Sequence, residues 1–222
     1  MHIPERYTET HTGVYEQDHV GATVSQGLKE HYADGAERIL QNDQRHYRKL
    51  SELLNKRIDA AGISRTSCVA IGGGHPKLEV TAGFERIVVL DALANEYGDK
   101  HDLFEKYYGA ANVEYMQAVS DFQNIKINGT VTLVHFLEHL TADAGAELIE
   151  QVATNPLIIY GPNIQSARNE DWFHFKPADH NTFWTAEALE AQLRDVGYDR
   201  VDVTPYSDDY LIIATKERKN EN

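Results

Sequence analysis

The chain has 222 residues, and its 21 Lys and Arg against 35 Asp and Glu give a formal net charge of −14 at pH 7. Hydrophobic residues make up 41% of the sequence, which is enough for a sizeable core and excludes general disorder. One Cys cannot form an internal disulfide, the apolar runs are too short to span a bilayer, and the N-terminus lacks an apolar signal core, so we expect a cytoplasmic protein without a membrane anchor.

Residues 1–62 are expected to form a helical N-terminal extension or lid. Residues 1–20 are polar without a clear period, which predicts an extended or loosely helical arm. From about Ala36 apolar residues return at helical spacing, and Gly62 follows them where a left-handed residue ends a helix. This extension could also support a homo-oligomer by contacting a second subunit. The apolar stripe consists of Leu40, Tyr47, Leu50, Leu54 and Ile58.

Residues 63–218 alternate short apolar runs with helical stretches, before a tail at 219–222. That alternation predicts an α/β domain with a parallel sheet and right-handed crossovers. The last two apolar runs are separated only by a turn around residues 207–209, so the chain should close with an antiparallel hairpin. The expected helices are residues 143–152 and 185–196, and the expected strands are residues 68–71, 87–90, 113–118, 130–136, 157–160, 201–203 and 210–214.

The ends of the first two predicted strands carry candidate ligand-binding residues. In an open parallel sheet, ligands bind beyond the carboxyl ends of the strands. The first strand ends in Gly72, Gly73 and Gly74, whose backbone can turn sharply and approach a ligand closely. The second strand ends in Asp91, followed by Ala92, and a carboxylate there can accept both hydroxyls of a ribose. Alternatively, the glycines form only a tight turn and Asp91 caps a helix.

The third predicted strand is followed by Asp121 and Phe122, an acid and an aromatic residue suited to an adenine. Their order and spacing after the glycines and Asp91 favour an adenosine-type cofactor.

The run Leu137-Glu138-His139-Leu140 follows the fourth strand, and His180 begins a later His-x-x-x-Trp-Thr segment that opens a helix. With these motifs the chain resembles the class I S-adenosylmethionine-dependent methyltransferases, from about Arg65 to Lys216. The resemblance implies a Rossmann-like, seven-stranded, mostly parallel sheet with an antiparallel C-terminal hairpin. It also implies an enzyme that uses S-adenosylmethionine to methylate an O or N atom of a small or medium acceptor, either a small molecule or a protein.

The same resemblance implies roles for individual residues. The glycine turn would pass the methionine portion, Asp91 would bind the ribose, and Asp121 and Phe122 would flank the adenine. His135 would lie under the methionine moiety or near the substrate. Methyl transfer needs mainly alignment of the nucleophile, with a base only where the acceptor must lose a proton. Glu138, His139 and His180 are the candidates for that base or for acceptor positioning, although a Glu-His pair can also serve only to fix its loop.

Two alternatives stay open. Where the family has an acid and a third glycine in its first motif, this chain has Ala70 and Pro76, which suits a catalytically inactive methyltransferase-like domain that acts as a binding or assembly module. The chain also resembles small-RNA 2′-O-methyltransferases, which hold a divalent metal. This resemblance implies that His135, Glu138, His139 and His180 of this chain would be the metal ligands. The acidic charge disfavours nucleic acid, so the leading expectation includes no metal.

Overall fold

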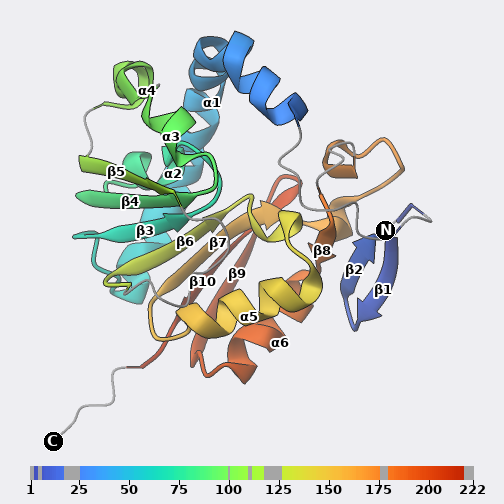
Figure 1. Cartoon of the computed structure of the whole chain (residues 1–222). Helices are drawn as coiled ribbons and strands as arrows, with labels where there is room; N and C mark the ends of the chain where they lie inside the picture. Colours follow the sequence, from blue (N-terminus) through green and yellow to red (C-terminus); the bar gives the residue numbers. More distant parts are fainter. Residues whose placement is uncertain are drawn as a thin grey trace, which may run out of the picture. The chain divides into compact units, whose positions relative to one another are not determined.

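The computed structural model describes residues 3–4, 7–17, 26–99, 101–109, 112–117, 127–175 and 180–217, without the side chains of 17 and 26–42. Within that part of the chain the fold is α/β, with a seven-stranded sheet in the order β5-β4-β3-β6-β7-β10-β9 and a separate three-stranded sheet β1-β2-β8 (Figure 1). None of the described helices combines the length and hydropathy needed to cross a membrane.

The seven-stranded sheet is mostly parallel and closes with the predicted antiparallel hairpin. β3 pairs in parallel with β4 and β6, and β4 pairs in parallel with β5. β10 runs antiparallel to both β7 and β9. The predicted sheet class and its terminal hairpin are therefore confirmed. The strands are β3 (Cys68–Ile71), β4 (Arg86–Asp91), β5 (Asn112–Gln117), β6 (Thr130–Val134), β7 (Leu157–Pro162), β9 (Arg200–Tyr206) and β10 (Asp209–Thr215).

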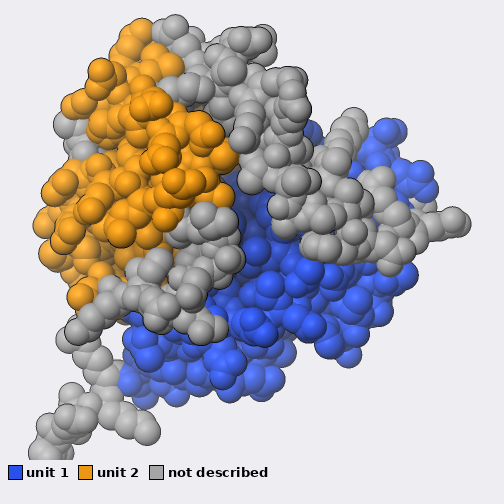
Figure 2. Space-filling view, viewed as in Figure 1, with its two compact units in different colours: residues 1–22, 135–222 blue, residues 23–134 orange. Residues whose placement is uncertain are grey.

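The chain divides into two compact units, which Figure 2 shows in different colours. The first unit combines residues 1–22 with residues 135–222, and the second is the continuous segment 23–134. The domain boundary that the sequence suggested after residue 62 stays a prediction. Each unit is described below by itself.

The second unit begins with the predicted long helix, α1 (Gln26–Ala61). Of the expected apolar stripe, Leu50, Leu54 and Ile58 are buried, and the side chain of Leu40 lies outside the described residues. Gly62 adopts a φ of +66° directly after the helix, which is the left-handed conformation expected at a helix C-terminus. α1 packs on α2 (Lys77–Thr81) and α4 (His101–Tyr108), while α3 (Ala94–Gly98) packs on β4 and β5.

The strands β3 and β6 of the second unit are buried along their whole length, as expected for central strands of a parallel sheet. All four residues of β3 and all five of β6 are buried. Cys68, at the start of β3, is a buried free thiol. Burial raises the pKa of this thiol, and the nearby charge of Glu79 adds a smaller increase. The lone Cys is therefore a core residue.

The first unit begins with a β-hairpin where the sequence predicted an extended or loosely helical arm. β1 (Tyr7–His11) pairs with β2 (Val14–Gln17), and β2 pairs in turn with β8 (Thr182–Trp184). Tyr7 and Val14 are buried, whereas the rest of β1 is exposed. The hairpin therefore owes its strand conformation to a partner far along the chain, which a local pattern does not reveal.

The helices of the first unit match their predicted positions and begin at threonine caps. α5 (Ala142–Val152) follows Thr141, whose hydroxyl accepts a hydrogen bond from the Ala144 amide. α6 (Ala186–Asp195) follows Thr185, which accepts in the same way from Ala188. Such caps satisfy amide groups that have no partner within the helix. The short 3₁₀ helices of this unit are η2 (Leu137–His139), η3 (Ile164–Ser166) and η4 (Phe173–Phe175).

Candidate functional site

The turn after β3, in the second unit, consists of glycines in a conformation that other residues rarely adopt. Gly72, Gly73 and Gly74 have φ values of +66°, +76° and +73°. A Cβ at Gly73 would lie 2.5 Å from the carbonyl oxygen of Val134, and a Cβ at Gly74 would lie 2.9 Å from the Tyr97 ring. The turn therefore requires glycine for both conformation and space. Gly73 itself is exposed, so its backbone is accessible to a ligand.

Asp91, at the end of β4, fixes this turn. Its Oδ2 accepts a hydrogen bond of 3.2 Å from the Gly74 amide, and its Oδ1 accepts one of 2.8 Å from the Leu93 amide. The side chain is half-buried, and each carboxylate oxygen has a second lone pair. Asp91 can thus support the turn and still accept hydrogen bonds from the hydroxyls of a ligand.

Aromatic side chains pack behind the glycine turn within the second unit. The ring of His75 is buried and stacks on Phe104 at a centroid distance of 4.9 Å, and its Nδ1 lies 3.0 Å from the hydroxyl of Tyr115. Tyr97 is also buried and lies edge-on to His75. His75 is therefore part of this packed cluster, and Tyr97 is a neighbour of the turn that sequence reasoning missed.

Of the other predicted cofactor residues of this unit, the structure describes Ala92 but not Asp121 or Phe122. Ala92 is half-buried, and its carbonyl oxygen accepts a hydrogen bond of 3.4 Å from the side chain of Gln117. Asp121 and Phe122 lie outside the described residues, so their contact with an adenine stays a prediction.

In the first unit, Glu138 is the centre of a cluster of histidines. It lies in η2, only 3% exposed, and its Oε1 is 3.1 Å from Nδ1 of His135. Burial opposes its ionisation, but the hydrogen bond with His135 and the charges of His135, His139 and His180 outweigh this effect and lower the pKa of Glu138 to about 2. Glu138 is therefore ionised at neutral pH.

A ladder of hydrogen bonds connects η2 to the segment before β8 and brings the predicted catalytic residues together. The Asn181 amide donates to the Glu138 carbonyl over 2.6 Å, and the Asn181 side chain donates to the His139 carbonyl over 3.1 Å. The rings of His139 and His180 consequently lie 4.9 Å apart. One ligand atom from each of Glu138, His139 and His180 falls within 4.8 Å of the others. The structure thus gathers the three residues that the sequence named as candidates for the base or for acceptor positioning.

His180 is held from two further directions. Its carbonyl oxygen accepts a 2.9 Å hydrogen bond from the hydroxyl of Tyr7 in the N-terminal hairpin, and its Nδ1 lies 2.8 Å from the carbonyl oxygen of His174. Tyr7 packs in an aromatic core with Phe175 and Phe183. The hairpin therefore supports the histidine cluster through the hydrogen bond from Tyr7 to the backbone of His180.

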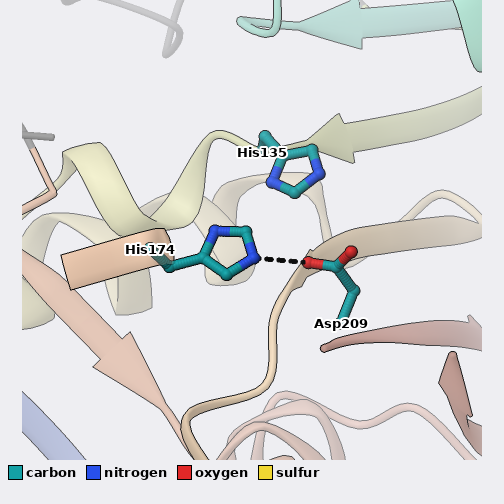
Figure 3. Close-up of side chains that lie close together, drawn as sticks. All are labelled: His135, His174 and Asp209. Carbon is teal, nitrogen blue, oxygen red and sulfur yellow. Dashed lines mark ion pairs between the residues drawn. The ribbon is translucent and has the colours of Figure 1, made fainter. Parts of the chain in front are cut away.

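A second group in the first unit contains two residues that were not predicted site residues. His135, His174 and Asp209 also place one ligand atom each within 4.8 Å of one another, and Figure 3 shows the three side chains converging. His174 Nε2 lies 3.2 Å from Asp209 Oδ1, and the Tyr160 hydroxyl donates to Asp209 Oδ2 over 2.6 Å. His135 lies among the histidines of this unit, and its expected place under the methionine moiety or near the substrate stays a prediction. In the sequence Asp209 looks like a turn residue, and only its pairing with Pro162 brings it to this group.

Three solved structures with a similar fold are methyltransferases. S-adenosylmethionine-dependent methyltransferase SibL, in its apo form, matches with a TM-score of 0.57 and 16% identity, over 87% of this chain and 60% of that one. Magnesium protoporphyrin IX methyltransferase ChlM from Synechocystis PCC 6803, with bound SAH, matches with a TM-score of 0.56 and 17% sequence identity. The match covers 86% of this chain and 93% of that one. Human N-acetylserotonin methyltransferase, in complex with SAM, matches with a TM-score of 0.60 and 12% sequence identity. The match covers 88% of this chain and 60% of that one.

The chain has the class I S-adenosylmethionine-dependent methyltransferase fold. No protein-family model and no curated relative matches its sequence. The chain spans about 60% of the length of SibL and of the human enzyme. Within this methyltransferase fold, the glycine turn follows β3 and Asp91 ends β4, while Ala70 occupies the buried position in β3 where the family's first motif has an acid.

Proposed function

We propose that this chain transfers a methyl group from S-adenosylmethionine to an O or N atom of a small or medium acceptor, a small molecule or a protein. The observation that carries the proposal is the left-handed glycine turn after β3, whose amide is hydrogen-bonded to the half-buried Asp91. When bound, S-adenosylmethionine supplies a methyl group activated on a sulfonium.

On the cofactor side, the chain supplies shape and hydrogen-bond acceptors. The backbone of Gly72, Gly73 and Gly74 would lie along the methionine portion, and the carboxylate of Asp91 would accept the ribose hydroxyls. Asp121 and Phe122 are proposed to flank the adenine. Ala70 offers no carboxylate to the amino group of the cofactor, so we expect weaker binding than an acid at this position would give.

On the acceptor side, the low pKa of Glu138 distinguishes the three candidate residues. A carboxylate with a pKa of about 2 is a poor proton acceptor at neutral pH, because an efficient base has a pKa near the working pH. Glu138 is therefore better suited to orienting imidazoles than to accepting a proton. The role of base, for acceptors that must lose a proton, falls to His139 or His180, since a neutral imidazole keeps one ring nitrogen that can accept a proton.

Cofactor binding is the direct test. A ligand that binds only the native state stabilises it, by about 2.7 kcal/mol at a concentration of 100 Kd. We expect S-adenosylmethionine or S-adenosylhomocysteine to raise the melting temperature, and Asp91→Ala to abolish that rise while the exposed control Asp99→Ala retains it. If saturating ligand gives no shift and no calorimetric heat with the wild-type chain, the proposal fails and the alternative of a non-catalytic binding or assembly module replaces it.

A second candidate function is metal-assisted 2′-O-methylation of RNA, favoured by the convergence of Glu138, His139 and His180. Two imidazoles and a carboxylate suit a divalent transition metal. This candidate predicts transfer of labelled methyl groups to a short RNA, dependent on Mn²⁺ and abolished by His180→Gln. Cofactor binding without any RNA methylation, with and without Mn²⁺, would eliminate it and leave the small or protein acceptor.

A further inference from the structure

We propose that His135, His174 and Asp209 form a binding site for a divalent transition-metal ion. The proposal is independent of cofactor binding, because it rests on side chains of the first unit alone. It also shares no residue with the group of Glu138, His139 and His180.

The three side chains come from separate parts of the first unit and meet at one point (Figure 3). His135 follows β6, His174 lies in η4, and Asp209 begins β10. Their ligand atoms lie within 4.8 Å of one another. Ligands bonded to Zn²⁺ at about 2.0–2.2 Å are themselves roughly 3–4 Å apart, so small side-chain rotations would bring all three onto one ion.

Burial makes the ion-free arrangement costly. His174 and Asp209 are 7% and 8% exposed. Asp209 Oδ1 faces His174 Nε2 at 3.2 Å, yet neither this oxygen nor Nδ1 of His174 makes a hydrogen bond to any described residue. Buried polar atoms without such partners destabilise the folded chain. His174 Nε2 and Asp209 Oδ1 face each other as two ligands of one ion do. An ion bound between them would coordinate Oδ1 directly.

Hydrogen bonds from neighbouring groups hold Asp209 and His135 in place. The Tyr160 hydroxyl donates to Asp209 Oδ2, which leaves Oδ1 toward His174. His135 has a φ of +48°, its amide donates to the Tyr160 carbonyl over 2.7 Å, and its Nδ1 contacts Glu138. A strained backbone persists only where its surroundings determine it, and hydrogen bonds from outside the ligand set orient metal ligands in the same manner. The His135 side chain is 30% exposed, so an ion has a route from solvent.

The donor set indicates the class of ion. Two imidazoles and one carboxylate suit Zn²⁺, Co²⁺, Mn²⁺ or Fe²⁺, whereas Mg²⁺ and Ca²⁺ prefer oxygen ligands. Co²⁺ is a useful probe because its visible spectrum reports coordination by nitrogen and oxygen.

The test is a Co²⁺ titration of the full chain, followed by its visible absorption and checked by Zn²⁺ calorimetry. We expect binding by the wild type, at least a tenfold loss of affinity in His174→Gln and in Asp209→Asn, and less than a twofold change in His139→Gln and in the exposed control His46→Gln. Absence of Co²⁺ and Zn²⁺ binding by the wild type, or loss of binding in His139→Gln with retention in His174→Gln, would overturn the proposal.

A crystal of the wild-type chain grown with Co²⁺ keeps the test independent of how the variants fold. Anomalous scattering should place the ion within bonding distance of His174 Nε2 and Asp209 Oδ1. An ion bound instead between Glu138, His139 and His180, or no anomalous peak at either group, would contradict the assignment.

Discussion

The glycine turn of the second unit and the histidine cluster of the first unit offer a ligand different kinds of group. The turn after β3 presents backbone, with one carboxylate that holds it in shape. The cluster presents titratable side chains that contact one another. Substitutions that add volume should therefore affect mainly the turn, and changes in the charge of side chains should affect mainly the cluster.

The buried glutamates of the two units sharpen the contrast. Glu79 is only 2% exposed, and burial raises its pKa because the hydrogen bonds from Thr132 and from its own backbone amide only partly offset the lost solvation. Glu138 is equally buried, yet its histidine neighbours lower its pKa. Burial alone thus does not decide the charge of a carboxyl group, since the presence of cationic partners can reverse its effect.

The largest effect is expected from a methyl group at the turn. Gly73→Ala would impose a left-handed conformation on alanine and bring its Cβ to 2.5 Å from the Val134 carbonyl oxygen. Strain and overpacking together should lower the free energy of unfolding by roughly 3–5 kcal/mol. Chemical denaturation measures this loss.

Gly62→Ala is the matched control, because Gly62 has a similar φ of +66° but nothing within 4 Å of an added Cβ. It should lose only about 1–2 kcal/mol, from backbone strain alone. Equal losses in the two variants would show that space at the turn is not limiting.

The next effect concerns acid stability through Glu138. Its pKa is about 2 in the folded chain against an ordinary 4.5, so its carboxylate contributes stability that is complete above pH 4.5 and is lost as the pH falls toward 2. The contribution is about 3 kcal/mol. In urea titrations between pH 7 and pH 3, Glu138→Gln should be less stable at pH 7 and should lose less stability on acidification than the wild type. Parallel pH profiles would contradict the assigned charge.

Glu79→Gln should show the opposite sign and a smaller effect. Because the pKa of Glu79 is raised, ionisation costs stability as the pH rises above its ordinary value of 4.5. The neutral amide avoids that cost and keeps an oxygen for the hydroxyl of Thr132. The variant should therefore be as stable as the wild type at pH 4 and more stable at pH 7, as measured in the same titrations. Destabilisation at pH 7 would show that the carboxylate has a partner of its own.

Much of the fold could be predicted from local sequence. The β-branched runs that became β6 and β7, and the short turn before β10, give signals within a few residues of one another. The N-terminal hairpin could not be predicted in this way, because β2 pairs with β8 across more than 160 residues.

The residues of the candidate site also divide into those that local sequence could predict and those that depend on distant pairing. Glu138 and His139 are adjacent in a recognisable motif, and His180 opens another, so their association could be predicted. Asp209 could not, because its proximity to His174 depends on the register that pairs it with Pro162. Hydrogen bonds between side chains that are distant in sequence, such as that from Tyr160 to Asp209, leave no periodic pattern.

The smallest effect tests whether the N-terminal hairpin supports the cluster through one hydrogen bond. Tyr7→Phe keeps the ring packed between Phe175 and Phe183 but removes the donor to the His180 carbonyl oxygen. A buried hydrogen bond of this kind contributes about 1 kcal/mol, so the melting temperature should fall by a few degrees. Tyr15→Phe, on the neighbouring strand, is the control and should change little. Because Tyr7 acts on the first unit only, S-adenosylmethionine should stabilise Tyr7→Phe as much as it stabilises the wild type. A lost ligand-induced shift would instead mean that the hairpin is coupled to the glycine turn, and the two regions could no longer be treated as separate.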